Sequence, residues 1–391
     1  MNISAVPDRS QKDVLLCLSH LRWNLVFQRP HHLLTRAARE FQVIYVEEAE
    51  SGERDDIRLQ RHGDILIATP VLGPGKVPGS EDSDREIAYR LAELVELHTP
   101  RRLVLWLYTP MALPLAAGLD PDCVVYDCMD ELSLFAGAPP SLHERERRLL
   151  ADCDLLFTGG ASLQEAKQAQ RPDAHCFPSS IDAAHFSRAR SGSRRDPEDQ
   201  AAIPHPRIGY FGVLDERLDR ELVAELAAAR PDWHFVMLGP VVKIRPDDLP
   251  QAANIHWLGP KRYEELPEYL GGWDAGFMPF ALNDATRFIS PTKTPEFLAA
   301  GLAVASTPVR DVVRGYGDAG LVEIASGAQE MEVALARVLA ARDDPDRLDA
   351  VRRRLATMSW DQSWAAMRDL VLDRLAANLR SSAHSESHAH V

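Results

Sequence analysis

Two series of short apolar runs constrain the fold of this chain more than any other feature of its sequence. The runs are continuous rather than alternating, and segments of helical character separate them. Strands that are apolar on both faces are typical of a parallel sheet covered by helices on both sides. The sequence therefore predicts an α/β protein with two Rossmann-like domains. The runs lie at 14–18, 43–46, 65–68, 103–107, 124–126 and 155–158, and then at 207–212, 234–238, 255–258, 275–278, 302–306 and 321–324.

The length of 391 residues suits two or three domains. Between the two series, residues 187–206 are rich in Arg, Ser, Asp and Pro and hold almost no large apolar side chain. Such a composition predicts a linker with an exposed loop. We therefore expect an N-terminal domain at 1–186 and a C-terminal domain at 207–358.

The C-terminal segment divides into a helix and a tail. Residues 359–380 place large apolar side chains at helical spacing, which predicts one strongly apolar helix face. The Ser- and His-rich residues 381–391 cannot build a core, so we expect a disordered tail there.

The overall charge excludes some functions. A formal net charge of -14 argues against nucleic acid as a ligand, because a duplex-binding surface needs a basic stripe. No apolar run reaches the roughly 18 residues that span a bilayer, and no signal peptide is visible, so we expect a cytoplasmic protein. Two basic clusters permit a weak contact with the inner face of the plasma membrane, although local ion pairs or a solvated helix face explain them better. They comprise Arg22, Arg29, Arg36 and Arg39, and Arg145, Arg147 and Arg148.

The residues 290–306 combine a polar loop, a helix start, a glycine and a buried strand. A helix N-terminus attracts anions, and Lys293 adds a full charge there. Glu296 follows within the first turn and can accept hydrogen bonds from a sugar diol, while Ser290 and Thr292 add hydroxyl groups. This pattern predicts a nucleotide site. The alternative is a helix whose acidic residue merely complements its dipole, with Lys293 in solvent.

A second cationic candidate follows the strand at 207–212. Gly212 ends that strand, and Arg217 lies in the loop behind it, at the edge where open α/β sheets bind ligands. Arg217 is therefore a candidate phosphate ligand. The structural alternative is a salt bridge to Asp215 or Asp219.

The N-terminal half offers acidic and imidazole candidates. Asp127 and Asp130 stand where the strand at 124–126 runs into an acidic loop, and paired carboxylates at this spacing can hold sugar hydroxyls or orient an acceptor. Capping of the next helix is the alternative. His20, in the first loop, is a candidate proton donor or hydroxyl contact beside Arg22 and Trp23.

Several of these segments together resemble the GT-B glycosyltransferases, closest to the retaining, family 4-like group that includes teichuronic-acid and exopolysaccharide enzymes. The resemblance covers roughly residues 14 to 375. It rests on the stretch from Ser19 to Leu34, on Tyr126-Asp-Cys-Met-Asp-Glu131, on Ser179-Ser-Ile-Asp-Ala-Ala-His-Phe186, and on residues 254–306.

The resemblance implies two Rossmann-like domains facing each other across a cleft, with the last helix crossing back to the N-terminal domain. It implies a hexosyltransferase-type reaction in which a sugar moves from a nucleotide-sugar donor to a glycan or lipid-linked acceptor in cell-surface polysaccharide synthesis. Lys293 and Arg217 would stabilise the leaving diphosphate. Glu296 matches the second glutamate of the family's Glu-x7-Glu motif, associated with the nucleotide ribose, whereas Phe288 occupies the position of the first.

We expect no cofactor beyond the nucleotide sugar and no metal. Asp120-Pro-Asp122 has the form of a metal-binding Asp-x-Asp but precedes a strand and is typical of a turn. No Gly-x-Gly-x-x-Gly follows a predicted strand, which disfavours a dinucleotide oxidoreductase. A sugar-nucleotide epimerase of the same fold, and an inactive nucleotide- or carbohydrate-binding protein, remain as alternatives.

Overall fold

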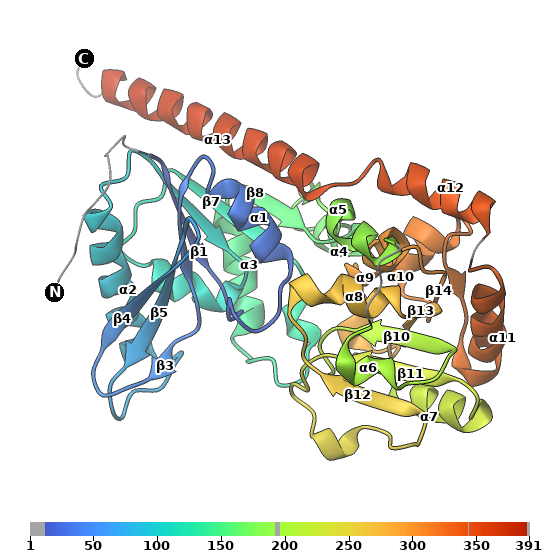
Figure 1. The fold of residues 1–391 in the computed structure, drawn as a ribbon. Coiled ribbons are helices and arrows are strands. Elements are labelled where there is room, and N and C mark those ends of the chain that lie inside the picture. The colour runs from blue at the N-terminus through green and yellow to red at the C-terminus, as the bar shows by residue number, and fades with distance from the viewer. Residues whose placement is uncertain (1–11, 192–195, 343, 389–391) are drawn as a thin grey trace.

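The computed structural model describes residues 12–191, 196–342 and 344–388. Its strands form two separate sheets (Figure 1). The first sheet runs in the order β3-β5-β2-β1-β6-β7-β8-β9, with β4 paired to β5. Every pairing is parallel except that of β4 with β5. The strands are β1 (Val14–Leu18), β2 (Gln42–Val46), β3 (Glu50–Ser51), β4 (Asp56–His62), β5 (Ile65–Leu72), β6 (Leu103–Leu107), β7 (Cys123–Cys128), β8 (Leu155–Thr158) and β9 (His175–Cys176).

The second sheet is parallel throughout and runs in the order β12-β11-β10-β13-β14-β15. All six predicted apolar runs of this half coincide with its strands, although the last two strands are shorter than the runs. The strands are β10 (Arg207–Phe211), β11 (His234–Leu238), β12 (Ile255–Gly259), β13 (Ala275–Met278), β14 (Val304–Ser306) and β15 (Glu323–Ile324).

Helices cover both faces of each sheet, which explains why the strands are apolar on both sides. Some helices begin at side-chain caps: Ser80 accepts from the Ser83 amide and Asp219 from the Leu222 amide. The helices are α1 (Arg29–Ala37), α2 (Glu81–Leu97), α3 (Leu142–Asp152), α4 (Ala161–Lys167), α5 (Ala183–Ser187), α6 (Glu198–Ala201), α7 (Arg220–Ala229), α8 (Leu266–Gly271), α9 (Lys293–Ala299), α10 (Arg310–Val312), α11 (Gly327–Ala340), α12 (Pro345–Leu355) and α13 (Trp360–His388).

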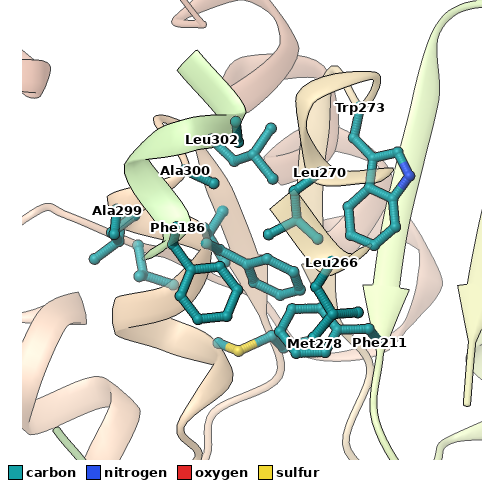
Figure 2. Close-up of a cluster of buried hydrophobic side chains, with 14 of the residues drawn as sticks. Phe186, Phe211, Leu266, Leu270, Trp273, Met278, Ala299, Ala300 and Leu302 are labelled. Atoms are coloured by element: carbon teal, nitrogen blue, oxygen red, sulfur yellow. The ribbon is translucent and has the colours of Figure 1, made fainter. Parts of the chain in front are cut away.

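The second half has a core on each face of its sheet, one beneath helices α5, α8, α9 and α12 and the other beneath α7 and α11. Figure 2 shows Phe186 of α5 packed among Phe211, Leu266 and Met278, so the helix that joins the two halves is part of the first of these cores. Phe186 is fully buried. This packing fixes where the chain enters the second half.

The predicted linker is only partly irregular. Residues 188–190 form a short 3-10 helix and 198–201 form α6, while Ala189 and Gln200 are buried. Gln200 accepts a hydrogen bond from the Trp273 indole, and the Arg207 guanidinium binds Asp196. The expectation of an exposed linker is therefore wrong for Ala189 and Gln200, whereas the other residues of the two short helices are exposed. Residues 192–195 lie outside the described ones.

The last helix crosses back over the first half, as the resemblance implies (Figure 1). Trp360, Trp364, Met367, Val371 and Leu375 pack on the face of the first sheet that α1 also covers. The helix extends to His388, so the expectation of a disordered tail is wrong as far as that residue. Residues 389–391 lie outside the described ones.

Candidate functional site

A cavity of about 660 Å³ lies between the two sheets, at the carboxyl ends of their strands. Loops that follow parallel strands meet at this edge, which is where open α/β sheets bind ligands. The first half contributes residues 23–29 and 31, together with Met129, Asp130 and Gly159. The second half contributes the ends of β10 and β11, residues 260–264 and the loop 289–293 with Glu296. Six predicted residues of the second half therefore line one space: Gly212, Arg217, Ser290, Thr292, Lys293 and Glu296.

Lys293 reaches the cavity because Gly212 has no side chain. A Cβ on Gly212 would lie 2.2 Å from Cε of Lys293, and the residue has a φ of 141°. Gly239, at the end of the neighbouring strand, supports this arrangement: a Cβ there would lie 1.8 Å from the Gly212 carbonyl oxygen. The lysine Nζ also lies 5.5 Å from the centroid of the Tyr210 ring. Gly212 thus positions Lys293 rather than serving only as the end of a strand.

Burial and charge make Lys293 receptive to an anion. Burial, followed by the charge of the Arg217 guanidinium, lowers the pKa of Lys293 to about 8, although Glu296, Asp215 and Asp130 act in the opposite direction. A bound phosphate would supply the missing counter-charge. The alternative of a solvated, functionless lysine is not what the structure shows.

Glu296 lies one helical turn from Lys293 and is 5% exposed. Among the described residues, its Oε2 has no hydrogen-bond partner. Burial raises the pKa of Glu296 to about 7, opposed by the charge of Lys293 and by a hydrogen bond from Thr292. A buried acceptor without a partner costs about 1–3 kcal/mol, so this oxygen is poised to accept a hydroxyl donor from a ligand.

The loop before α9 is tied to the segment that joins the two halves. The Ser290 carbonyl oxygen accepts a hydrogen bond of 2.7 Å from the Ser179 hydroxyl. Ser290 and Thr292 both line the cavity. Their positions agree with the sequence prediction of a polar loop at the site.

The sequence leaves open whether Arg217 faces the ligand site or forms a salt bridge, and in the structure it does both. Its Nε and Nη2 bind the Asp215 carboxylate, with a shortest distance of 2.7 Å, while Asp219 caps α7 instead. Its side chain is 25% exposed and lines the cavity. The ion pair with Asp215 therefore holds the guanidinium at the wall of the cavity.

Of the two aspartates in the first half, only Asp130 lines the cavity. Burial raises its pKa, and the nearby charges of Arg217, Lys243 and Lys293 lower it, so Asp130 faces the cationic wall. Asp127 is 0% exposed and accepts hydrogen bonds of 2.8 to 3.1 Å from the Arg29 guanidinium. The prediction that Asp127 contacts a substrate is wrong, because its carboxylate is committed to a buried ion pair.

The role predicted for His20 stays a prediction. His20 is not among the residues that line the cavity. Burial, with a smaller contribution from the Lys243 charge, lowers its pKa to about 4, so the imidazole is neutral. Its Nδ1 is buried and, within the described residues, has no hydrogen-bond partner.

Sequence reasoning missed two contacts between the halves near the site. Lys243, in the loop after β11, does not line the cavity, but its Nζ lies 4.6 Å from the centroid of the Phe135 ring of the first half. Its φ of 67° is unusual for a residue with a side chain. The other feature is a set of stacked rings that includes Phe27 and Tyr263. No motif marks either feature, because both depend on contacts between the two halves.

The basic clusters of the sequence are engaged in local ion pairs. Arg36 and Arg39 bind Asp361, and Arg147 binds Glu144. The pairs Arg22–Glu50, Arg29–Asp127, Arg145–Asp84 and Arg148–Asp152 account for the other members. This outcome favours the ion-pair alternative over a lipid-binding surface.

Two negative findings concern the described residues. They contain no group of three or more His, Cys, Asp or Glu side chains that could hold a metal ion. Within the same ranges, none of the helices is both long and apolar enough to cross a membrane.

Two facing Rossmann-like sheets, a cleft between their carboxyl edges and a last helix that returns to the first half define the GT-B fold. Comparison with solved structures agrees. A sucrose-phosphate synthase from Thermosynechococcus elongatus superimposes with a TM-score of 0.71 at 13% identity, over 94% of this chain and 100% of the other. An Escherichia coli structure described as trehalose-6-phosphate bound with UDP-2-fluoro glucose has a TM-score of 0.65 at 14% identity, over 92% of this chain and 99% of the other.

A third structure has a similar likeness. The UDP-forming alpha,alpha-trehalose-phosphate synthase of Burkholderia xenovorans in complex with glucose-6-phosphate has a TM-score of 0.66 at 15% identity, over 92% of this chain and 99% of the other. At these identities the likeness establishes the fold. No family model matches the chain.

Among curated proteins, the chain is similar to one from Bacillus subtilis (strain 168) that is provisionally named the teichuronic acid biosynthesis glycosyltransferase TuaH. The two are 27% identical over 242 residues, which is 56% of this chain. The match spans 60% of the relative's length.

Proposed function

We propose that this protein is a glycosyltransferase that moves a sugar from a nucleotide-sugar donor to a glycan or lipid-linked acceptor. The observation that carries the proposal is the pair Lys293 and Glu296: a half-buried cation and a buried carboxylate oxygen, which has no hydrogen-bond partner among the described residues, line one cavity between two Rossmann-like sheets. A diphosphate and a ribose carry the complementary groups. The names of the solved relatives, which include UDP-forming enzymes and a UDP-sugar complex, support the donor class.

In the proposed reaction the second half holds the donor. Lys293 and the Arg217 guanidinium bind the diphosphate and stabilise the charge that grows on it as the glycosidic bond breaks. Glu296 accepts hydrogen bonds from the ribose, and Ser290 and Thr292 line the donor side. Interactions that strengthen in the transition state lower the barrier directly.

The first half holds the acceptor. Asp130 lines the opposite wall and is suited to accept a hydrogen bond from the attacking hydroxyl. We propose retention of configuration, with the leaving phosphate taking the acceptor proton on the same face, so that no separate protein base is needed. A role in cell-surface polysaccharide synthesis is proposed from the name of the Bacillus subtilis relative.

The proposal includes no metal ion and no further cofactor. Asp122, the second acidic residue of the Asp-x-Asp, accepts a hydrogen bond of 2.7 Å from the Leu103 amide, at the amino ends of β6 and β7. It therefore lies at the edge of the sheet opposite to the cavity. A cytoplasmic location is part of the same proposal.

The proposal is tested by incubating the protein with UDP-, GDP- and dTDP-sugars. Transfer or slow hydrolysis of one donor is the expected result. Conversion to an isomeric donor would instead indicate an epimerase, and binding without turnover an inactive binding protein.

A second test uses variants. Lys293→Ala and Glu296→Ala should each weaken nucleoside diphosphate binding by about 1.5–3 kcal/mol, the cost of losing one hydrogen bond to a charged group. Arg262→Ala is the matched control, because Arg262 also lines the cavity but already pairs with Glu265 at 3.2 Å. If calorimetry gives Lys293→Ala and Glu296→Ala the same nucleoside diphosphate affinity as the wild type, the assignment of the donor site is wrong.

A further inference from the structure

A stack of rings connects the two halves of the molecule at the wall of the cavity. The Tyr263 ring, in the loop between β12 and α8, lies 4.1 Å from the Phe27 ring of the first half, with an angle of 17° between the planes. The second ring stacked on it is that of His185 in α5, also at 4.1 Å and with an angle of 8°, while His32 and Phe186 meet it edge-on. Tyr263 is therefore held between the first half and the segment that joins the halves.

The stack leaves only one part of Tyr263 free to meet a ligand. Since two rings are stacked on it, a nucleotide base has no free face to stack on, whereas the residue still lines the cavity. The phenolic oxygen is buried, and in the part of the chain that the structure describes it has no hydrogen-bond partner. A buried hydroxyl normally finds a partner, so the missing one is expected to come from a ligand.

The cavity contains a second polar atom of the same kind, Oε2 of Glu296. The two side chains are near enough for the Glu296 carboxylate to raise the pKa of Tyr263, after the larger effect of burial. A phenol donates and accepts hydrogen bonds, while a carboxylate only accepts them. The two neighbouring hydroxyl groups of a ribose carry the donors and acceptors that complement these two atoms.

We propose that Tyr263 is a nucleotide-binding residue that holds the ribose hydroxyls together with Glu296 and, through its stack on Phe27, couples donor binding to the approach of the first half. This inference rests on the proposed nucleotide site in the same cavity. It assigns a donor-specificity role to a residue outside the motif that contains Lys293 and Glu296.

The contacts that hold the Tyr263 ring explain how donor binding is coupled to the approach of the first half. The His185 imidazole contacts the Tyr263 carbonyl oxygen at 2.9 Å, which fixes the tyrosine on the side of the joining segment. Phe27 precedes α1 and also stacks on His31 of that helix, at 4.6 Å. A ligand that immobilises the tyrosine hydroxyl therefore favours the position of the ring in which it meets Phe27.

The decisive measurement is the discrimination between nucleotides with and without ribose hydroxyls. Calorimetry measures Kd for UDP and GDP and for their 2′-deoxy and 3′-deoxy counterparts, with the wild type, Tyr263→Phe and Phe27→Ala. In the wild type, removal of the hydroxyl that meets Tyr263 should weaken binding about tenfold, the value of one hydrogen bond. In Tyr263→Phe, which keeps the stacked ring, this ratio should fall to about one, and binding of the deoxy nucleotide should not change.

Phe27→Ala is the matched control for the stack. It should weaken both nucleotides of a pair by the same factor and leave their ratio as in the wild type, because it removes coupling and no ribose contact. A wild-type ratio in Tyr263→Phe would overturn the inference while leaving the proposed function intact. Failure of the wild type to bind any of these nucleotides would overturn both.

Discussion

At the scale of single residues, Lys293 and Glu296 lie one helical turn apart and titrate close to neutral pH. Burial lowers the pKa of Lys293 to about 8 and raises that of Glu296 to about 7. A diphosphate binds the charged lysine, and ribose hydroxyls donate best to the ionised carboxylate. We predict that nucleoside diphosphate affinity rises from about pH 6 to pH 7 and falls by up to about tenfold per unit above pH 8, where binding requires proton uptake.

Calorimetry of two variants across the pH range shows which residue causes the acid limb and which the alkaline limb of this affinity profile. Lys293→Arg keeps its charge at high pH and should remove the alkaline loss of affinity. Glu296→Gln cannot ionise, so it should keep the alkaline limb that Lys293 produces and lose the acid limb, apart from the part that comes from the ligand's own phosphate, with a pKa of about 6. A wild-type affinity that is constant across this range would contradict the assignment of both residues.

The residue-level predictions from sequence succeed or fail for one physical reason. Asp130 lies in the loop after β7, while Lys293 and Glu296 lie in the first turn of α9, and the parallel topology brings loops and helix starts of this kind to one edge of each sheet. Asp127 is the last residue but one of β7, where the side chain turns toward Arg29 of α1. Its ion-pair partner lies in a distant segment, so no local pattern could reveal it.

At the scale of elements, the ends of β10 and β11 depend on two glycines in close contact. Replacement of Gly212 by alanine would place a Cβ against Lys293 and force a side chain into a φ of 141°. We predict that Gly212→Ala weakens nucleotide binding at least tenfold and lowers the free energy of unfolding by about 1–3 kcal/mol, a typical cost of backbone strain. Denaturant titration and calorimetry measure the two effects separately.

Gly118→Ala is the matched control for this variant. Gly118 also has a positive φ, of 86°, but a Cβ there meets no atom within 4 Å. It should lose stability through strain and keep the wild-type affinity. Equal affinities for Gly212→Ala and Gly118→Ala would show that Lys293 does not depend on the end of β10.

Strands that are buried on both faces are predictable from sequence, because their apolar runs are continuous. β4 (Asp56–His62) escapes this rule, since it is largely exposed and pairs with β5 alone. The residues 198–201 escape it for another reason: α6 is short and polar, and Gln200 is buried through hydrogen bonds rather than through apolar packing. Such elements form because of tertiary contacts, which the hydrophobic periodicity of the sequence does not reveal.

At the scale of the whole molecule, the chain passes between the halves twice, before α5 and between α12 and α13 (Figure 1). The sequence suggests that Trp360 and Trp364 pack across both halves. Instead, both belong to the core of the first half. Relative motion is therefore restrained less by α13 than by contacts near the cleft, and two connecting segments of this kind are typical of a hinge.

One of these contacts joins α10 of the second half to the start of α4 of the first. The Asp311 carboxylate accepts a hydrogen bond of 3.0 Å from the Ser162 amide, and Arg310 and Arg314 bind Glu165 at 2.8 and 2.7 Å. Gly160 makes room for this contact, because a Cβ there would lie 2.2 Å from Oδ2 of Asp311. Asp311 thus caps a helix that belongs to the other half.

We predict that Asp311→Ala favours an open arrangement of the two halves, because the free amides at the start of α4 then prefer water to the facing helix. In small-angle scattering without ligand, the variant should have a larger radius of gyration than the wild type, and saturating nucleoside diphosphate should reduce the difference. Asp318→Ala, a change in the same region away from this contact, should behave as the wild type. Scattering profiles that are the same for Asp311→Ala and the wild type, with and without a nucleotide shown to bind, would exclude both the contact as a restraint and closure driven by the donor.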